Sequence, residues 1–199
     1  MNILITGTAG LAASLKEQLS PQHTVTCVSR QTGHDINQVT DWGPDFYHYD
    51  VCINSAYSGW AQVAVLEQFY YAWRNDAGKQ NINIGSSIID YTRIEQDKEY
   101  EYMNYRVHKQ SLQSASYKLS KLAQCDIKLI NPGAIDTAMI QHLNFADKMT
   151  PEFVAKRLWP SCKNLVLRKW TCGNKLAILS LAFRTQCGMC CALSQVSAS

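Results

Sequence analysis

A short glycine turn near the amino terminus limits most strongly how this chain folds. The apolar run Asn2–Thr6 is typical of a strand, and Leu11–Leu19 has the spacing of a helix. Between them, one glycine permits a tight turn and a second permits close approach of a ligand, because glycine lacks a β-carbon. Backbone amides and the positive helix end would then face a pyrophosphate. The residues expected to bind it are Gly7, Thr8, Ala9, Gly10 and Leu11.

Short strand-like runs alternate with helix-like stretches along the rest of the chain. Such alternation predicts an α/β fold, a doubly wound parallel sheet of the Rossmann type in a single compact domain. The 199 residues, 46% of them hydrophobic, suffice for one core. Further strands are expected at Thr24–Val28, Asp50–Asn54, Asn81–Gly85, Ile127–Asn131 and, with a weaker pattern, Lys175–Leu181. Further helices are expected at Trp60–Arg74, Tyr102–Ala123 and Pro151–Leu158.

Composition argues against several other classes of protein. The net charge of +3 gives no support for a nucleic-acid partner. We expect no membrane insertion, because no apolar run approaches the roughly 20 residues that span a bilayer. The first strand begins at once, without the basic region or cleavage site of a secretory signal, so we expect a cytoplasmic location. The cysteines of the chain are then expected to be reduced.

The last part of the chain differs in composition. We assign residues 1–158 to the dinucleotide-binding domain and 159–199 to an atypical basic, cysteine-rich segment in which a last strand is expected. After Glu152 no acidic residue follows, and seven basic ones do. This basic surface is either solvated or a contact for an anionic partner. Four of its five cysteines are candidate metal ligands: Cys172, Cys187, Cys190 and Cys191. They include one zinc-like spacing without a matched second pair, so no metal site is predicted.

The end of the second strand bears on which dinucleotide binds. Ser29 offers a hydrogen bond and Arg30 a positive charge, where an NAD-selective site usually has an acidic residue. We therefore expect NADP, with NAD less favoured, and no carboxylate there to repel the 2′-phosphate. Asp35 and Ile36 are expected against the adenine. Three residues end the next strand at the same sheet edge and are expected to contact the cofactor: Asn54, Ser55 and Ala56.

A tyrosine and a lysine stand one helical turn apart at Tyr105 and Lys109. A tyrosine has a pKa near 10, and a nearby ammonium is expected to lower that pKa, so Tyr105 could exchange a proton with a carbonyl oxygen. The same ammonium would hold ribose hydroxyls. The catalytic serine is expected at Ser86, with Ser87 as the alternative. Tyr117 and Lys121 share the spacing but stand too close to the next strand.

A Pro-Gly turn follows the strand Ile127–Asn131. Its exposed backbone groups would meet the carboxamide of a nicotinamide ring, although a loop alone would also explain the two residues. The expected contacts are Pro132, Gly133, Ile135 and Thr137.

Taken in this order, the glycine turn, the serine strand, the tyrosine–lysine helix and the Pro-Gly-x-Ile-x-Thr loop resemble the short-chain dehydrogenase/reductase family. The resemblance covers about Met1 to Leu158. It implies a Rossmann-type fold, NAD(P)-dependent interconversion of a carbonyl and an alcohol on a small molecule, and homo-oligomers formed through the helices Trp60–Arg74 and Tyr102–Ala123. The chain departs from the family in three respects. The turn has the form Thr-Gly-x-x-Gly-x-x-Ala, and the stretch between the second strand and Asp50 is too short for a full third strand. The asparagine that many members carry in the helix before the serine strand has no counterpart among Ala61–Ala64.

Two other functions fit parts of the pattern. A non-catalytic NADP(H)-binding regulator needs the nucleotide site alone, and the presence of both Tyr105 and Lys109 argues against it. A nucleotide-sugar epimerase or a similar reductase is suggested by the form of the glycine turn, but the chain is short where a sugar-nucleotide pocket would form.

Overall fold

Five parallel strands form the central sheet, in the order β2-β1-β3-β4-β5. The computed structural model describes residues 1–90, 99–142, 148–163, 170–172 and 175–177. The strands are β1 (Asn2–Thr6), β2 (Thr24–Val28), β3 (Val51–Asn54), β4 (Gln80–Ile84) and β5 (Asp126–Ile130). The long helices are α1 (Leu11–Leu19), α2 (Ala61–Trp73), α3 (Glu99–Ser120) and α4 (Pro151–Lys163).

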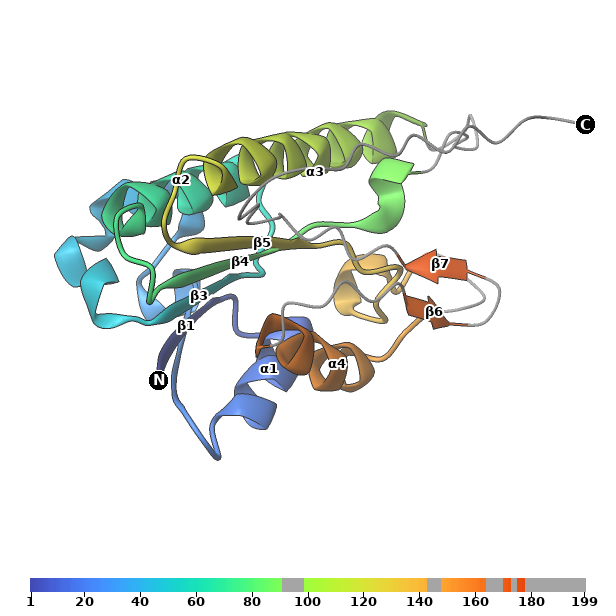
Figure 1. Cartoon of the computed structure of the whole chain (residues 1–199). Helices are drawn as coiled ribbons and strands as arrows, with labels where there is room; N and C mark the ends of the chain where they lie inside the picture. The colour runs from blue at the N-terminus through green and yellow to red at the C-terminus, as the bar shows by residue number, and fades with distance from the viewer. Residues whose placement is uncertain (91–98, 143–147, 164–169, 173–174, 178–199) are drawn as a thin grey trace, which may run out of the picture.

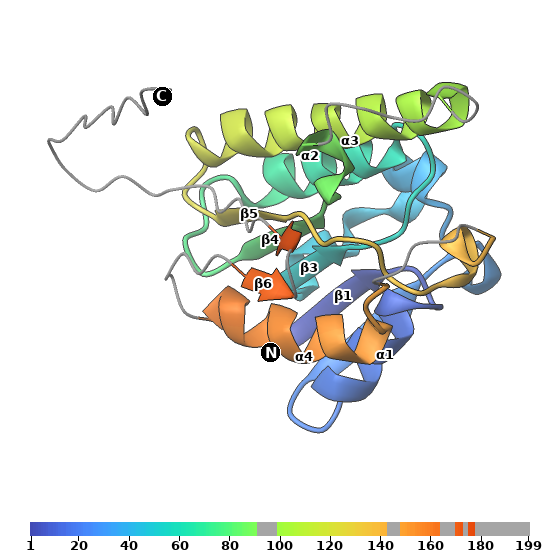
Figure 2. The same ribbon diagram turned by 90° about the vertical axis from the view of Figure 1, so that its right-hand side faces the viewer.

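Helices cover both faces of the sheet (Figures 1 and 2). Helices α1 and α4 lie on one face, and α2 and α3 lie side by side on the other. Ile3 and Ile5 of β1 pack toward α1 and α4, whereas Leu4 packs toward α2 and α3. Because both faces are buried, the strands are continuous apolar runs instead of alternating ones. The predicted α/β doubly wound sheet is confirmed.

The strand order places a switch point between β1 and β3. From β1 the chain first adds β2 on one side and then continues through β3, β4 and β5 on the other. In open sheets of this kind, ligands bind beyond the carboxyl ends of the strands at such a point. The glycine turn follows β1 at this edge, so it lies where a ligand is expected to bind.

The residues between β2 and β3 form no strand. They fold into three short 3-10 helices, Arg30–Thr32, Ile36–Trp42 and Pro44–His48. The missing third strand is thus confirmed in the described part of the chain. This connecting segment ends at the amino edge of the sheet, opposite the glycine turn.

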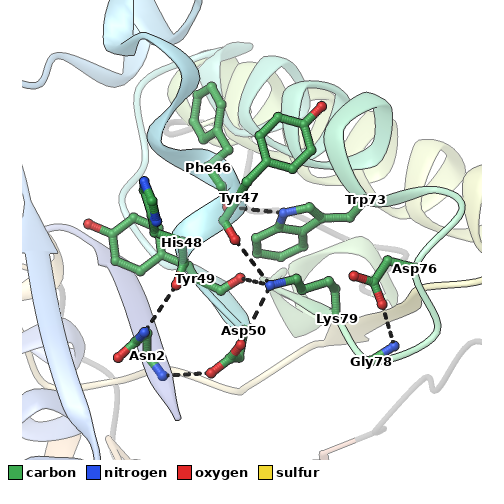
Figure 3. Close-up of polar contacts among 10 residues, drawn as sticks. All are labelled: Asn2, Phe46, Tyr47, His48, Tyr49, Asp50, Trp73, Asp76, Gly78 and Lys79. Atoms are coloured by element: carbon green, nitrogen blue, oxygen red, sulfur yellow. Dashed lines mark hydrogen bonds and ion pairs between the residues drawn. The ribbon is translucent and has the colours of Figure 1, made fainter.

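Side chains from α2 and from the residue just before β4 hold this segment in place (Figure 3). Trp73 Nε1 donates a hydrogen bond to the backbone oxygen of Phe46 at 3.0 Å. Lys79 Nζ donates to the backbone oxygens of Tyr47 and Tyr49 at 3.2 and 2.8 Å. A cation at the last carbonyls of a helical turn also interacts favourably with the turn's dipole. These contacts stabilise the edge of the fold that faces away from the candidate site.

Some element boundaries differ from the sequence prediction. Helix α4 runs to Lys163 instead of ending at Leu158, because Val154, Leu158 and Trp159 keep its apolar face against the core. The predicted last strand is also different. Its first residues form β7 (Lys175–Ala177), which pairs antiparallel with β6 (Trp170–Cys172) apart from the parallel sheet. The remaining residues of that prediction, 178–181, lie outside the described residues.

Two negative findings hold for the described residues. None of their helices has both the length and the apolar character needed to cross a membrane. No group of three or more His, Cys, Asp or Glu side chains among them is arranged to hold a metal ion. Cys172 ends β6, while Cys187, Cys190 and Cys191 lie outside the described part of the chain.

Candidate active site

The glycine turn connects β1 to α1 at the carboxyl edge of the sheet. Gly7 and Gly10 have φ angles of 101° and 55°, a region that residues with a side chain rarely adopt. The amide of Gly7 donates to the backbone oxygen of Val28 at 2.7 Å. A β-carbon on Gly10 would lie 3.0 Å from Cγ2 of Thr137. The structure therefore brings the glycine turn and the Pro-Gly loop together, and the cradle between them requires a glycine.

The start of α1 is suited to an anion. No side chain caps this end of the helix, and its first turn contains no acidic residue. The positive end of the helix dipole is therefore not neutralised by its own first turn. Thr8 and Ala9 are exposed beside it, whereas the side chain of Leu11 is buried in the core. Of the predicted contacts, Leu11 presents only its backbone to this space.

The residues after β2 surround the position expected for the adenosine. Ser29 is half-buried and Arg30 is exposed. The carboxylate of Asp35 accepts hydrogen bonds from the backbone and side chain of Asn37 at 2.9 and 2.7 Å, and these bonds, with the charge of Arg30, lower the pKa of Asp35. The expectation that no carboxylate lies near Arg30 is therefore wrong. Ile36 is buried in the core beneath α2.

Thr6 joins the end of β1 to the loop after β3. Its side chain is fully buried, and its Oγ1 accepts hydrogen bonds from the amides of Ser55 and Ala56, both at 2.9 Å. A β-carbon on Gly7 would lie 3.6 Å from Cβ of Ala56. Ser55 and Ala56 therefore border the glycine turn as predicted. The side chain of Asn54 is fully buried and bonds within the protein, so it faces away from this border.

The Pro-Gly loop is fixed by backbone pairing. Ile135 and Met149 form an isolated parallel bridge, and a β-carbon on Gly133 would lie 3.3 Å from Cε of Met149. Pro132 is buried, and its backbone oxygen accepts a hydrogen bond from the amide of Ser87 at 2.9 Å. Thr137 precedes a short 3-10 helix and lies against the glycine turn.

The serine loop after β4 is held by the last residue before the Pro-Gly turn. Asn131 is buried, and its Oδ1 accepts a hydrogen bond from the amide of Ser86 at 3.1 Å. Any β-carbon on Gly85 would clash with this same oxygen. Ser86 makes a side-chain hydrogen bond with Tyr105. Of the two serines considered, the structure therefore places Ser86 beside the tyrosine.

Lys109 lies in the interior, with 3% of its surface exposed. Its Nζ donates hydrogen bonds to Oε1 of Gln62 at 2.6 Å and to the backbone oxygen of Ile84 at 2.9 Å. The rings of Tyr57 and Tyr105 each lie with their centroid 5.4 Å from Nζ. Since Ile84 ends β4, the lysine sits at the carboxyl edge of the sheet, the same edge as the glycine turn.

Burial controls the proton affinity of both groups. Burial lowers the pKa of Lys109 from 10.5 to about 7, although its two acceptor oxygens favour the ammonium. The pKa of Tyr105 is raised, first by burial and also by Tyr57, and its hydrogen bond with Ser86 only partly opposes this. The expectation that Lys109 lowers the pKa of Tyr105 is therefore wrong in direction. Lys109 is not among the groups that shift the pKa of Tyr105.

An aromatic cluster, Tyr57, Trp60 and His108, borders Tyr105. The rings of Tyr57 and Tyr105 meet edge to face at 4.8 Å, and the hydroxyl of Tyr57 bonds to Nδ1 of His108 at 2.9 Å. Trp60 is 55% exposed and meets the ring of His108 at 4.6 Å. Tyr57 and His108 are half-buried, so the cluster extends from Tyr105 to the exposed Trp60. By contrast, the alternative pair lies at the exposed end of α3, where Lys121 stacks on Tyr117.

Four of the residues that shape the site escaped the sequence analysis: Thr6, Tyr57, Gln62 and Asn131. Tyr57 directly follows the predicted Asn54–Ala56 contact, so its position at the sheet edge was a usable signal. Gln62 lies within Ala61–Ala64, where many members of the resembled family carry an asparagine, and this chain has a glutamine instead. Thr6 and Asn131 gave no signal, because a threonine or an asparagine at the end of a strand is common.

Solved structures share this fold. A short-chain dehydrogenase from Burkholderia cenocepacia in complex with NADP superposes with a TM-score of 0.65 at 15% identity, covering 83% of this chain and 85% of that one. A 3-alpha-hydroxysteroid dehydrogenase from a Pseudomonas species, complexed with NADH, gives 0.59 at 17% identity, covering 81% and 89%. A short-chain dehydrogenase from Sphingobium yanoikuyae in complex with NADPH gives 0.60 at 15% identity, covering 81% and 84%.

The chain thus has a Rossmann-type α/β fold, the fold of these short-chain dehydrogenases/reductases. No protein-family model matches the sequence, and no curated protein matches it significantly. At 12–17% identity the solved structures speak to the fold alone, so the activity has to be argued from the residues of this chain.

Proposed function

We propose that this protein is an NADP-dependent oxidoreductase of the short-chain dehydrogenase/reductase type, which interconverts a carbonyl and an alcohol on a small molecule. The observation that carries the proposal is the convergence of Ser86, Tyr105 and Lys109 at the carboxyl edge of the sheet. They arrive there from the loop after β4 and from α3, at the same edge of the sheet as the glycine turn that follows β1. A fold alone would not require three such side chains to meet.

The residues present suit a nicotinamide dinucleotide. The uncapped start of α1 and the cradle between Gly10 and Thr137 favour a pyrophosphate. An ammonium has three N–H donors, and Lys109 uses two of them on Gln62 and Ile84. The third would bond a ribose hydroxyl of the nicotinamide half. When bound, the reduced nicotinamide supplies the hydride that adds to the carbonyl carbon and is itself oxidised.

The chain's own residues would manage the proton. Tyr105 donates its phenolic proton to the carbonyl oxygen, and Ser86 hydrogen-bonds that same oxygen. The raised pKa of Tyr105 keeps the phenol protonated near neutral pH, which favours the reducing direction. After the step, the phenolate regains a proton from solvent.

Replacing the tyrosine tests this role directly. Tyr105→Phe removes only the hydroxyl and should lower turnover with NADPH and a panel of small aldehydes and ketones about 10²–10⁴-fold. Tyr117→Phe, on the exposed end of the same helix, is the matched control and should keep full activity. Equal activity in Tyr105→Phe would remove the proton-transfer role. Cofactor binding without turnover of any carbonyl would instead favour a regulator.

The preference for NADP rests on Arg30. An arginine–phosphate contact contributes about 1.5–3 kcal/mol, which is roughly ten- to a hundredfold in affinity. Arg30→Ala should weaken NADPH binding by that factor and leave NADH binding unchanged, as followed by nicotinamide fluorescence. Arg74→Ala, an exposed arginine at the end of α2, is the control. Tighter binding of NADH than NADPH by the wild-type protein would overturn the preference, because Asp35 would then be the deciding charge.

We further propose that the protein forms a homo-oligomer through the outer faces of α2 and α3. Large apolar side chains are exposed on this pair of helices, which lie side by side over the sheet (Figure 2). They are Tyr71, Met103, Val107 and Tyr117. Sedimentation should show a dimer or tetramer that Tyr71→Glu dissociates, whereas a monomeric wild-type protein would refute the assembly.

A further inference from the structure

Gln62 lies at the start of α2 with only 2% of its surface exposed. Its Oε1 accepts the hydrogen bond from Lys109 Nζ at 2.6 Å. Its Nε2 donates to the backbone oxygens of Asn54 and Ile84 at 3.1 and 3.2 Å. Since backbone oxygens only accept hydrogen bonds, the amide nitrogen must face them and the amide oxygen must face the lysine. The orientation of this side chain is therefore determined by its surroundings.

Three buried asparagines form a hydrogen-bond network that holds the backbone of Gln62. Asn54 Nδ2 donates to the backbone oxygen of Gln62 at 2.7 Å and to Oδ1 of Asn83 at 2.9 Å. Asn83 Nδ2 donates to Oδ1 of Asn81 at 3.2 Å, and Asn81 Nδ2 donates to the backbone oxygen of Leu66 at 3.4 Å. This network links β3, β4 and α2. Gln62 is thus a fixed point against which a flexible lysine can be held.

The surroundings of Lys109 make this acceptor decisive. The titratable groups that face Nζ in the described part of the chain are Tyr57 and Tyr105, with His108 one hydrogen bond further away. The pKa of Lys109 is lowered by burial alone. An ammonium in such a place depends on its acceptor oxygens. In the described part of the chain these are the side-chain oxygen of Gln62 and the backbone oxygen of Ile84.

We propose that Gln62 is a positioning residue, whose amide oxygen holds the ammonium of Lys109 beside Tyr105 and leaves its third N–H for the cofactor. The part that concerns the cofactor rests on the proposed function, whereas the contact itself does not. Gln62 acts through Lys109 and touches no reacting atom. It occupies the stretch of α2 in which the sequence showed no asparagine.

Two substitutions of opposite electrostatic effect test this role. Gln62→Met removes the acceptor and should lower the pKa of Lys109 by about one unit, because the charged form loses a hydrogen bond. Gln62→Glu places a carboxylate on the ammonium and should raise that pKa by about 1–3 units. The readout is nuclear magnetic resonance titration of isotope-labelled lysine in the full-length protein, with the Lys109 signal assigned by its loss in Lys109→Arg. Gln80→Met, at the opposite end of β4, should leave the pKa unchanged.

Opposite shifts in the two variants support the role, and a merely structural glutamine would not produce them. If Gln62→Met fails to fold, the upward shift in the isosteric Gln62→Glu decides by itself. A Lys109 pKa unchanged in Gln62→Glu overturns the inference, whatever the enzyme does. A wild-type protein without any nicotinamide-dependent turnover overturns the proposed function instead, and the shifts measured by resonance remain. Where turnover exists, the pH profile of kcat/KM should move in the same directions.

Discussion

The buried lysine makes the stability of this protein depend on pH in a defined way. Lys109 is buried and has a pKa of about 7 in the folded protein, against 10.5 for an ordinary lysine such as one in the unfolded chain. Between these two values the unfolded state binds more protons than the folded state. The free energy of unfolding therefore rises with pH through this window. Below it, both states are protonated and the cost of burying the ammonium is complete.

The size of the effect follows from the pKa difference. A shift from 10.5 to about 7 corresponds to on the order of 5 kcal/mol at low pH. At about pH 9 the unfolded lysine is still mostly protonated, so about 3 kcal/mol of that cost is relieved between about pH 6 and about pH 9. Lys109→Met removes the titrating group and fills the space with an unbranched apolar chain. Its stability relative to wild type should therefore fall by about 3 kcal/mol over the same range.

Urea denaturation followed by tryptophan fluorescence at the two pH values measures this difference. Comparing variant with wild type at each pH cancels the titration of all other groups. Lys118→Met, an exposed lysine on the same helix, is the matched control, and its stability difference should not change with pH. A difference for Lys109→Met that stays constant within about 0.5 kcal/mol, or that grows with pH, would refute the burial argument.

Two further predictions concern the edge of the sheet near the glycine turn. Gly10→Ala should weaken binding of the nicotinamide dinucleotide about tenfold or more, because its new β-carbon would lie 3.0 Å from Thr137 and φ is 55°. Gly43→Ala, with φ of 76° and no neighbour within 4 Å, should lose about 1 kcal/mol of stability but keep its affinity. Equal affinities in both variants would contradict the cradle. Thr6→Val keeps the shape of the side chain but leaves two amides without their acceptor, so urea denaturation should show a loss of about 1–3 kcal/mol. A loss below about 0.5 kcal/mol would mean that those amides find other partners.

Local patterns explain why much of the architecture was predictable. β1, α1 and β2 have the bounds expected from the sequence. Each of them is defined by a pattern within a few residues: an apolar run for the two strands, and an amphipathic stretch after the glycine turn for the helix. The missing third strand followed from chain length. The placement of Tyr105 and Lys109 on one helix followed from their four-residue spacing. β6 and β7 were not predictable as a separate hairpin, because antiparallel pairing depends on which strand edge is near.

The sequence by itself determined the order of elements, the glycine turn and the tyrosine–lysine pair, since each depends on residues within one strand or one helical turn. Only the tertiary structure decided what Lys109 contacts and how tightly it holds its proton. Gln62 and Lys109 are 47 residues apart in the chain, and Ser86 and Asn131 are 45 apart. Such pairs meet only when the sheet and its covering helices assemble, and the burial that sets the pKa values of Tyr105 and Lys109 exists only in that assembly.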